Sequence, residues 1–182
     1  MKVVFLDRDG VINIYPGEGR YVNKWGEFSF IPGSIEGIRK LNEKGFKVFV
    51  VSNQAGVAKG LYTFKDLLYI NKKMTGVLKK QGAFLEGIHY CIHQEGQECS
   101  CRKPKTGLLQ RALKESKTNP RISFLVGDSL KDIKTAVNFG AKSILVLSGK
   151  EKIANRNKWD VEPDYIFDNL LVAAYYICSH YG

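Results

Sequence analysis

Two aspartates that follow a short apolar run are the first residues in this chain that could do chemistry. Residues 3–6 are apolar, and Asp7 and Asp9 come directly after them, ahead of Gly10. Side chains alternate along a strand, so both carboxylates are expected on the same side, and the glycine lets the chain turn away. Such a pair can divide labour, since one carboxylate attacks or holds a metal ion while the other moves a proton. The alternative is structural: a strand that ends in an Asx turn.

Two further apolar runs are also followed by polar residues. Ser52 and Asn53 come after residues 47–51, and Asp128 comes after Gly127 at the end of the second run. Ligands bind beyond the carboxyl ends of parallel strands, so these groups are expected to converge on one edge of a sheet. Ser52 and Asn53 offer a hydroxyl, an amide and backbone N–H groups for phosphate oxygens, although a polar turn uses the same residue types.

The carboxylates of Asp7, Asp9 and Asp128 would then share one small site. Unpaired, they would repel one another and raise one another's pKa values. Mg²⁺ resolves this conflict, because it favours carboxylates together with water and a substrate phosphate. A simpler interpretation of Asp128 and Asp132 is that one of them caps the helix that follows.

A second cluster contains sulfur and imidazole groups. Cys91-x-His93 is followed, after five residues, by Cys99-x-Cys101. Three thiolates and one imidazole can fold a loop around a tetrahedral Zn²⁺, and four protein ligands leave no open position, so this zinc is expected to be structural. The alternative is a set of reduced cysteines, or one disulfide. The first residues lack a secretion-signal pattern, which favours metal over disulfide and predicts a cytoplasmic location.

Alternating strands and helices must position these groups. The chain has 182 residues, of which 44% are hydrophobic, and this suits one domain with a sizeable core. Short apolar runs that alternate with helical patterns predict an α/β fold, a doubly wound parallel sheet covered on both faces. The predicted strands are residues 3–6, 47–51, 87–91, 122–126, 143–147 and 165–167, and the predicted helices are residues 34–44, 63–81, 106–116, 130–139 and 169–178.

The charge composition indicates which kinds of molecule this protein could bind. The chain has 28 Lys and Arg against 18 Asp and Glu, a formal net charge of +10. Such a surface attracts anions, including phosphorylated metabolites and nucleic acid. The basic residues are spread along the chain without a long block, and no basic stripe is interleaved with aromatic residues, which disfavours nucleic acid. No apolar run is long enough to cross a membrane.

Taken together, the motifs resemble a known family. The chain resembles the haloacid dehalogenase (HAD) phosphatases, in particular the subgroup of D-glycero-D-manno-heptose 1,7-bisphosphate 7-phosphatases and histidinol-phosphate phosphatases. This resemblance implies a Rossmann-like HAD fold with minimal or no cap and a small zinc-binding loop, as one phosphatase domain over residues 1–182. The motifs that carry it are Phe5-Leu6-Asp7-Arg8-Asp9-Gly10-Val11-Ile12-Asn13, Ser52-Asn53-Gln54, Cys101-Arg102-Lys103-Pro104 and Gly127-Asp128-Ser129.

The resemblance also implies a mechanism. Asp7 would attack phosphorus and form an aspartyl-phosphate. Asp9 would protonate the leaving alkoxide and then deprotonate the water that hydrolyses the intermediate. Mg²⁺ would be held by a carboxylate oxygen of Asp7, the backbone carbonyl of Asp9 and Asp128.

Substrate-binding roles follow from the same resemblance. Ser52 and Lys103 would bind the phosphoryl group, with Asn53 in support, and Arg102 would contact the rest of the substrate. Zinc would fix the loop that presents Arg102 and Lys103. Without the resemblance, Lys103 could equally be one surface lysine among many.

The substrate is expected to be a small phosphorylated metabolite, with a sugar bisphosphate, the heptose 1,7-bisphosphate, as the leading candidate. The alternatives are histidinol phosphate, a nucleic-acid 3′-phosphate and, outside enzymes, a zinc-stabilised binding module. Two departures from the heptose-enzyme pattern bear on specificity. Residues 14–22, termed the flap, form a longer segment that carries Arg20, and Ser129 stands where those enzymes often have lysine. We also expect a monomer.

Overall fold

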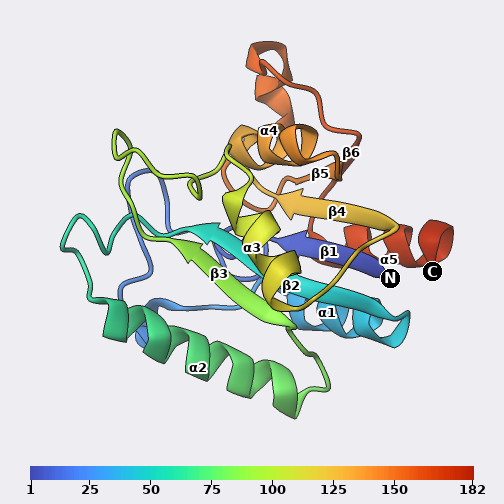
Figure 1. Ribbon diagram of the computed structural model, residues 1–182, viewed down its shortest axis with the longest axis horizontal. Coiled ribbons are helices and arrows are strands. Elements are labelled where there is room, and N and C mark those ends of the chain that lie inside the picture. Colours follow the sequence, from blue (N-terminus) through green and yellow to red (C-terminus); the bar gives the residue numbers. More distant parts are fainter.

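Six parallel strands form a single sheet in the computed structural model of the chain, which describes residues 1–182 (Figure 1). The strand order is β3-β2-β1-β4-β5-β6, so β1 lies between β2 and β4 near the centre. All neighbouring strands are parallel, which brings their carboxyl ends to one edge. The strands are β1 (Lys2–Leu6), β2 (Phe46–Asn53), β3 (Gly87–Cys91), β4 (Ile122–Gly127), β5 (Lys142–Val146) and β6 (Tyr165–Phe167).

Helices cover both faces of this sheet, which confirms the predicted doubly wound α/β fold (Figure 1). Each of the five predicted helical segments forms a helix, with boundaries that shift by up to three residues. The helices are α1 (Ser34–Glu43), α2 (Phe64–Lys80), α3 (Gly107–Glu115), α4 (Leu130–Phe139) and α5 (Leu170–Tyr181), with short 3₁₀ helices at η1 (Trp25–Glu27) and η2 (Ile153–Lys158).

Alternation along the strands creates two hydrophobic cores. In β1, Val4 and Leu6 are fully buried in a core that includes residues of α1, α2 and α5. Val3 and Phe5 are buried on the opposite face, in a core with residues of α3 and α4. Because both faces of the sheet are covered, the central strand β1 is an apolar run from Val3 to Leu6 with no polar face, as is typical of parallel sheets.

The second strand is longer than the sequence predicts. Residues 47–51 form the apolar part of β2, but the strand extends through Ser52 and Asn53, which pair with Tyr90 and Cys91 of β3. The sheet ladder overrides the low strand propensity of these polar residues. The two side chains therefore stand on a rigid strand rather than in a turn.

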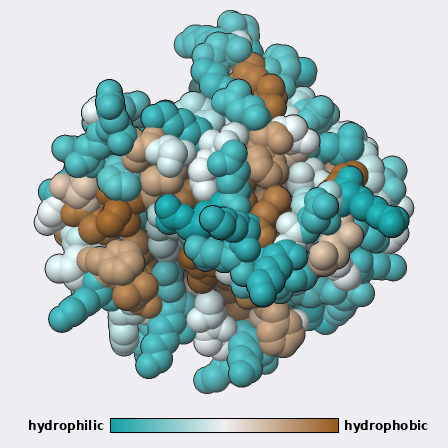
Figure 2. All heavy atoms as spheres, in the orientation of Figure 1, coloured by the Kyte–Doolittle hydropathy of each residue, from teal (hydrophilic) through white to brown (hydrophobic).

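The surface is mostly hydrophilic in the view of Figure 2, with hydrophobic side chains on the left, over the segment that leads into α2. Leu61, before α2, and Phe64, its first residue, are 53% and 49% exposed. None of the helices combines the length and the apolar character that a membrane span needs.

Thr63 caps α2, and its replacement tests the local stability of that helix. The Thr63 hydroxyl accepts a hydrogen bond from the Asp66 N–H at 3.1 Å, and the Asp66 carboxylate accepts one from the Thr63 N–H at 2.8 Å. We expect Thr63→Ala to lower the free energy of unfolding by about 1 kcal/mol in urea titrations followed by circular dichroism. Thr75→Ala, inside the same helix, is the control and should cost nothing, because alanine has the higher helix propensity. Equal losses in the two variants would contradict this role of the cap.

Candidate active site

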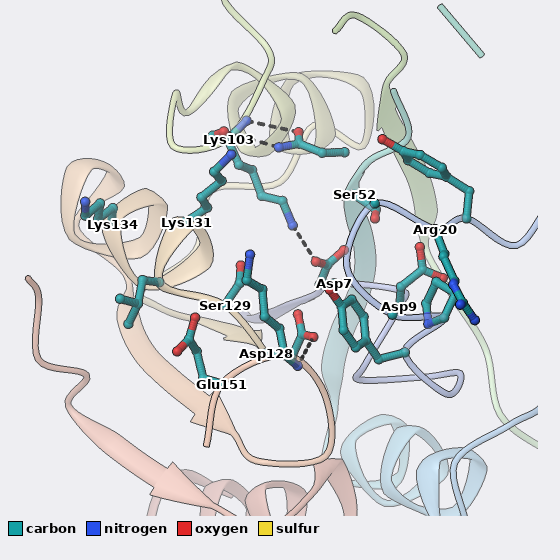
Figure 3. Close-up of a pocket in the computed structure, with 18 of the residues that line it drawn as sticks. Asp7, Asp9, Arg20, Ser52, Lys103, Asp128, Ser129, Lys131, Lys134 and Glu151 are labelled. Carbon is teal, nitrogen blue, oxygen red and sulfur yellow. Dashed lines mark hydrogen bonds and ion pairs between the residues drawn. The ribbon is translucent and has the colours of Figure 1, made fainter. Parts of the chain in front are cut away.

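Functional side chains from different strands meet at the carboxyl edge of the sheet. Asp7 follows β1, Ser52 lies near the end of the neighbouring strand β2, and Asp128 follows β4 on the other side. All three line one cleft with a volume of about 490 Å³ (Figure 3). The convergence that the strand ends predict is therefore present in the fold.

A buried lysine from the segment between β3 and α3 reaches this cleft. The ammonium nitrogen of Lys103 lies 2.9 Å from Oδ2 of Asp7 (Figure 3). It also contacts Oδ1 of Asp132 and donates to the Val51 carbonyl at 3.0 Å. The lysine is 2% exposed. Burial alone would lower its pKa, but the carboxylates of Asp132 and Asp7 outweigh burial and raise the pKa. Lys103 therefore carries a full positive charge beside Asp7.

From the sequence, Asp132 is interpreted only as a possible helix cap, but the structure places it beside Lys103 in the site. It does cap α4, where its carboxylate accepts hydrogen bonds from the Ser129 N–H at 3.2 Å and the Ser129 hydroxyl at 2.6 Å. The same fully buried side chain also pairs with Lys103. The only sequence signal for it is its position three residues after Ser129 in a Ser-x-x-Asp pattern, which also fits an ordinary capping box.

Asp128 is held in place by close backbone contacts. Oδ2 of Asp128 accepts a hydrogen bond from the Lys150 N–H at 2.8 Å. A Cβ atom on Gly10 or Gly149 would lie 2.1 or 2.0 Å from the same oxygen, so only glycine fits at either position. Burial raises the pKa of Asp128 well above its usual value, and the neighbouring carboxylate of Asp7 adds to the shift.

The acids outnumber the base in this buried cluster. Carboxylate oxygens of Asp7, Asp128 and Asp132 lie within 4.8 Å of one another. Burial raises the pKa of Asp7 to about 6, although Lys103 opposes the shift. Three carboxylates around one ammonium leave an excess of negative charge, and hard oxygen donors at this spacing fit a divalent cation such as Mg²⁺.

Asp9 also lines the cleft, and its carboxylate is embedded in donors. Nε and Nη2 of Arg8 donate to Oδ1 at 3.1 and 2.9 Å, and Nη2 also contacts Oδ2 at 3.0 Å. Asn13 adds a hydrogen bond to Oδ1 and Gln54 adds one to Oδ2, each at 2.9 Å. Arg8 itself is fully buried. The side-chain roles of Arg8, Asn13 and Gln54 were not predicted, because a motif match does not reveal which side chains meet.

Asn53 points its amide at the backbone of the lysine segment. Its Oδ1 accepts from the Lys103 N–H at 3.1 Å, and its Nδ2 donates to the Lys103 carbonyl at 3.2 Å (Figure 3). Both polar ends of the amide are thus used on Lys103. The Asn53 side chain fixes the lysine backbone, while Ser52 is the side chain of β2 that lies on the Asp7 side of the cleft (Figure 3).

The Cys and His residues predicted to bind zinc form one cluster. Sγ of Cys91 lies 3.8 Å from Sγ of Cys99 and 3.6 Å from Nδ1 of His93, and Sγ of Cys101 lies 3.4 Å from the same nitrogen. A tetrahedral Zn²⁺ with ordinary bond lengths would space two sulfurs by about 3.8 Å, and a sulfur and a nitrogen by about 3.6 Å. These three separations fit zinc coordination, and ligand atoms of all four residues lie within 4.8 Å of one another.

Arg102 is tied to this zinc loop. Its Nη1 donates to the His93 carbonyl at 3.1 Å, and the residue also lines the cleft beside Lys103. The loop that carries the cysteine cluster therefore positions Arg102, the residue that precedes Lys103.

The flap closes the opposite side of the cleft. Glu18 accepts a hydrogen bond from the Tyr15 hydroxyl at 3.2 Å and pairs with the Lys150 ammonium at 2.9 Å. Arg20 lines the cleft on this side, across from Lys131 on α4 (Figure 3). The flap is thus linked to the same residue, Lys150, whose N–H holds Asp128.

Comparison with known proteins identifies the class of enzyme to which this chain belongs. A family model described as HAD-hydrolase-like matches residues 100–173, and the fold is that of a HAD-like hydrolase. The chain belongs to the D-glycero-β-D-manno-heptose-1,7-bisphosphate 7-phosphatase family of these enzymes.

Three similar proteins support this assignment. The enzyme of that name from Haemophilus influenzae is 37% identical, with 93% of each chain covered, and the one from Pasteurella multocida is 38% identical, with 93% and 92% covered. The crystal structure of D,D-heptose 1,7-bisphosphate phosphatase from B. bronchiseptica, complexed with magnesium and phosphate, has a TM-score of 0.90 at 29% identity, covering 98% of this chain and 99% of that one.

Gly149 offers a test of the packing around Asp128. We expect Gly149→Ala to lower the free energy of unfolding by about 1–3 kcal/mol in urea titrations, because the added methyl group displaces a buried carboxylate. Gly76→Ala, on the open face of α2 where a Cβ atom meets nothing within 4 Å, should instead stabilise the protein by about 0.5–1 kcal/mol. An unchanged stability for Gly149→Ala would show that this loop does not pack against Asp128.

Proposed function

We propose that this chain is a Mg²⁺-dependent phosphatase that removes the 7-phosphate of D-glycero-D-manno-heptose 1,7-bisphosphate, and that residues 1–182 act as one catalytic domain. The observation that carries the proposal is the contact of the Asp7 carboxylate with the buried Lys103 ammonium, at the carboxyl edge of the sheet. A carboxylate held beside a fixed cation is suited to attack phosphorus while the cation neutralises the transferring group.

In the proposed reaction Asp7 is the nucleophile and Asp9 moves protons. An Asp7 oxygen forms a bond to phosphorus as the bond from phosphorus to the sugar oxygen breaks, and Asp9 gives its proton to that oxygen. Water then attacks the aspartyl-phosphate, gives its proton to Asp9, and releases inorganic phosphate and free Asp7. Ser52 and Lys103 hold the phosphoryl oxygens in both steps, and Asn53 supports them by fixing the Lys103 backbone.

Mg²⁺ fits the excess of carboxylates in the cleft. We assign the Asp7 carboxylate, the Asp9 backbone carbonyl and Asp128 as its ligands, and Asp132 as the partner of Lys103. When bound, the ion neutralises negative charge on the carboxylates and on the phosphoryl group. The similar enzyme that was crystallised with magnesium and phosphate supports this assignment.

Charge in the cleft supports a doubly phosphorylated substrate. Only three of its 21 lining residues are hydrophobic, which suits a polyhydroxylated sugar better than the imidazole ring of histidinol phosphate. Arg102 lies beside Lys103 and is assigned to the sugar or its second phosphate. The basic residues that line the cleft are Arg20, Arg102, Lys103, Lys131, Lys134, Lys150 and Lys158.

We further propose that Cys91, His93, Cys99 and Cys101 bind a structural Zn²⁺. The sulfur and nitrogen spacings given above support this, and burial raises the pKa of the Cys91 thiol to about 12, so a cation is needed to keep that thiol ionised. Zinc would act on catalysis only indirectly, through the loop that carries Arg102 and Lys103. A cytoplasmic, monomeric protein remains the prediction from the sequence.

Activity is tested with Mg²⁺ and a panel of heptose 1,7-bisphosphate, histidinol phosphate and a 3′-phosphorylated oligonucleotide, with phosphate release as the readout. We expect the bisphosphate to have the highest kcat/KM and Asp7→Asn to reduce kcat by at least ~1,000-fold, because the nucleophile is lost. Asp168→Asn, an exposed acid outside the cleft, is the matched control and should retain wild-type activity. Full activity in Asp7→Asn would refute the covalent mechanism, and a preference for another member of the panel would refute the substrate.

Zinc is tested by elemental analysis of the purified protein. We expect about one equivalent in the wild type and almost none in the Cys99→Ser, Cys101→Ser double variant, because two of the four ligands are lost. Cys178→Ser, at a cysteine outside the cluster, should keep the full equivalent. Unchanged zinc content in the double variant would exclude these ligands.

A further inference from the structure

Gln54 contributes a buried amide beside Asp9 that the proposed reaction does not use. It is fully buried, and its Nε2 donates both to Oδ2 of Asp9 at 2.9 Å and to the Ser52 hydroxyl at 3.2 Å. Its Oε1 accepts from the Tyr62 hydroxyl at 2.6 Å and from Nη2 of Arg8 at 3.2 Å. The two donors and two acceptor sites of the amide are therefore all in use.

The partners of Gln54 fix its orientation. Arg8 has only donors to offer, so the oxygen end of the amide must face it, and the Asp9 carboxylate requires the nitrogen end. An amide flip would break the contacts to both. In this single orientation, the amide connects Asp9, the predicted proton donor, to the hydroxyl of Ser52, the predicted phosphate ligand.

Tyr62 is held rigidly where it meets this amide. It is 6% exposed, and its ring lies so close to Gly56 that a Cβ atom there would be 2.2 Å from Cε1. On its other side the ring packs against Tyr21 at a centroid distance of 6.2 Å, and Tyr21 lines the cleft on the flap side. A continuous set of contacts therefore runs from the flap through Tyr62 and Gln54 to Asp9.

Asp9 has no spare capacity for a substrate in this arrangement. Four donor groups contact its two oxygens, and they fill the roughly four lone-pair sites of a carboxylate: Nε and Nη2 of Arg8, Nδ2 of Asn13 and Nε2 of Gln54. A leaving-group oxygen can reach Asp9 only where a donor yields. The donors that surround Asp9 therefore determine which of its oxygens faces the substrate.

We propose that Gln54, oriented by Tyr62, is a positioning residue that aims the Asp9 carboxyl group at the leaving-group oxygen and keeps it in register with Ser52. This inference rests on the proposed function and assigns residues that lie outside the reacting groups. It requires that loss of the Tyr62 hydroxyl impair proton donation by Asp9 while leaving attack by Asp7 intact.

Leaving-group dependence provides the test. The nitrophenolate of 4-nitrophenyl phosphate leaves without a proton, whereas the alkoxide of an alkyl phosphate needs one. The alkyl substrate is the alkyl phosphate of the panel that the wild type hydrolyses. For this substrate and for 4-nitrophenyl phosphate, kcat/KM is measured, because this parameter reports the steps up to departure of the leaving group. Tyr62→Phe removes only the hydroxyl, and Gln54→Met removes the amide at similar volume.

We expect Tyr62→Phe to lower kcat/KM about 10-fold for the alkyl phosphate and by less than about 2-fold for 4-nitrophenyl phosphate, with a larger difference between the substrates in Gln54→Met. Tyr165→Phe, which removes a hydroxyl paired with Tyr181 far from the cleft, is the matched control and should change neither value. Equal losses on both substrates, or no loss on either, would overturn the positioning role even if the wild type is a phosphatase. A wild type that hydrolyses neither substrate would refute the proposed function as well.

Discussion

The ion pair between Lys103 and its two buried carboxylates is the interaction on which the rest of the site depends. A lysine that is 2% exposed cannot stay charged without partners, and Asp7 and Asp132 supply them from the ends of β1 and the start of α4. Removal of either acid leaves a buried charge with one partner fewer. The pair therefore links the catalytic strand, the capped helix and the lysine segment into one electrostatic unit.

Lys103 reaches this position because its backbone is held from two sides. The Asn53 amide binds its N–H and carbonyl from β2, and the cysteine cluster folds the loop that precedes it. A long, flexible side chain gains most from such anchoring, since lysine loses about 2 kcal/mol of rotamer entropy when it is fixed. The proposed zinc site would thus serve catalysis by helping to place one ammonium group.

The sequence was sufficient to predict the sheet and the groups at strand ends, because apolar runs have a fixed period and parallel strands end at one edge. Asp7 and Asp128 were found in this way. Asp132 and Asn53 were harder, since a Ser-x-x-Asp pattern indicates a cap whether or not a lysine from another loop also binds it, and an asparagine at a strand end resembles a phosphate ligand. Their partners come from segments about 30 to 50 residues away, and only the tertiary fold brings these together.

Asp9, like Asp7, is the partner of a buried cation. Asp7 faces a lysine and the cleft, whereas Asp9 faces a fully buried arginine that itself needs a charged partner. Two neighbouring aspartates thus receive different cations: a single ammonium, which would leave the Asp7 carboxylate room for the proposed attack, and a guanidinium fork, which fixes the plane of the Asp9 carboxylate. A fixed carboxylate plane favours proton transfer in one direction, which is the property that the role proposed for Asp9 requires.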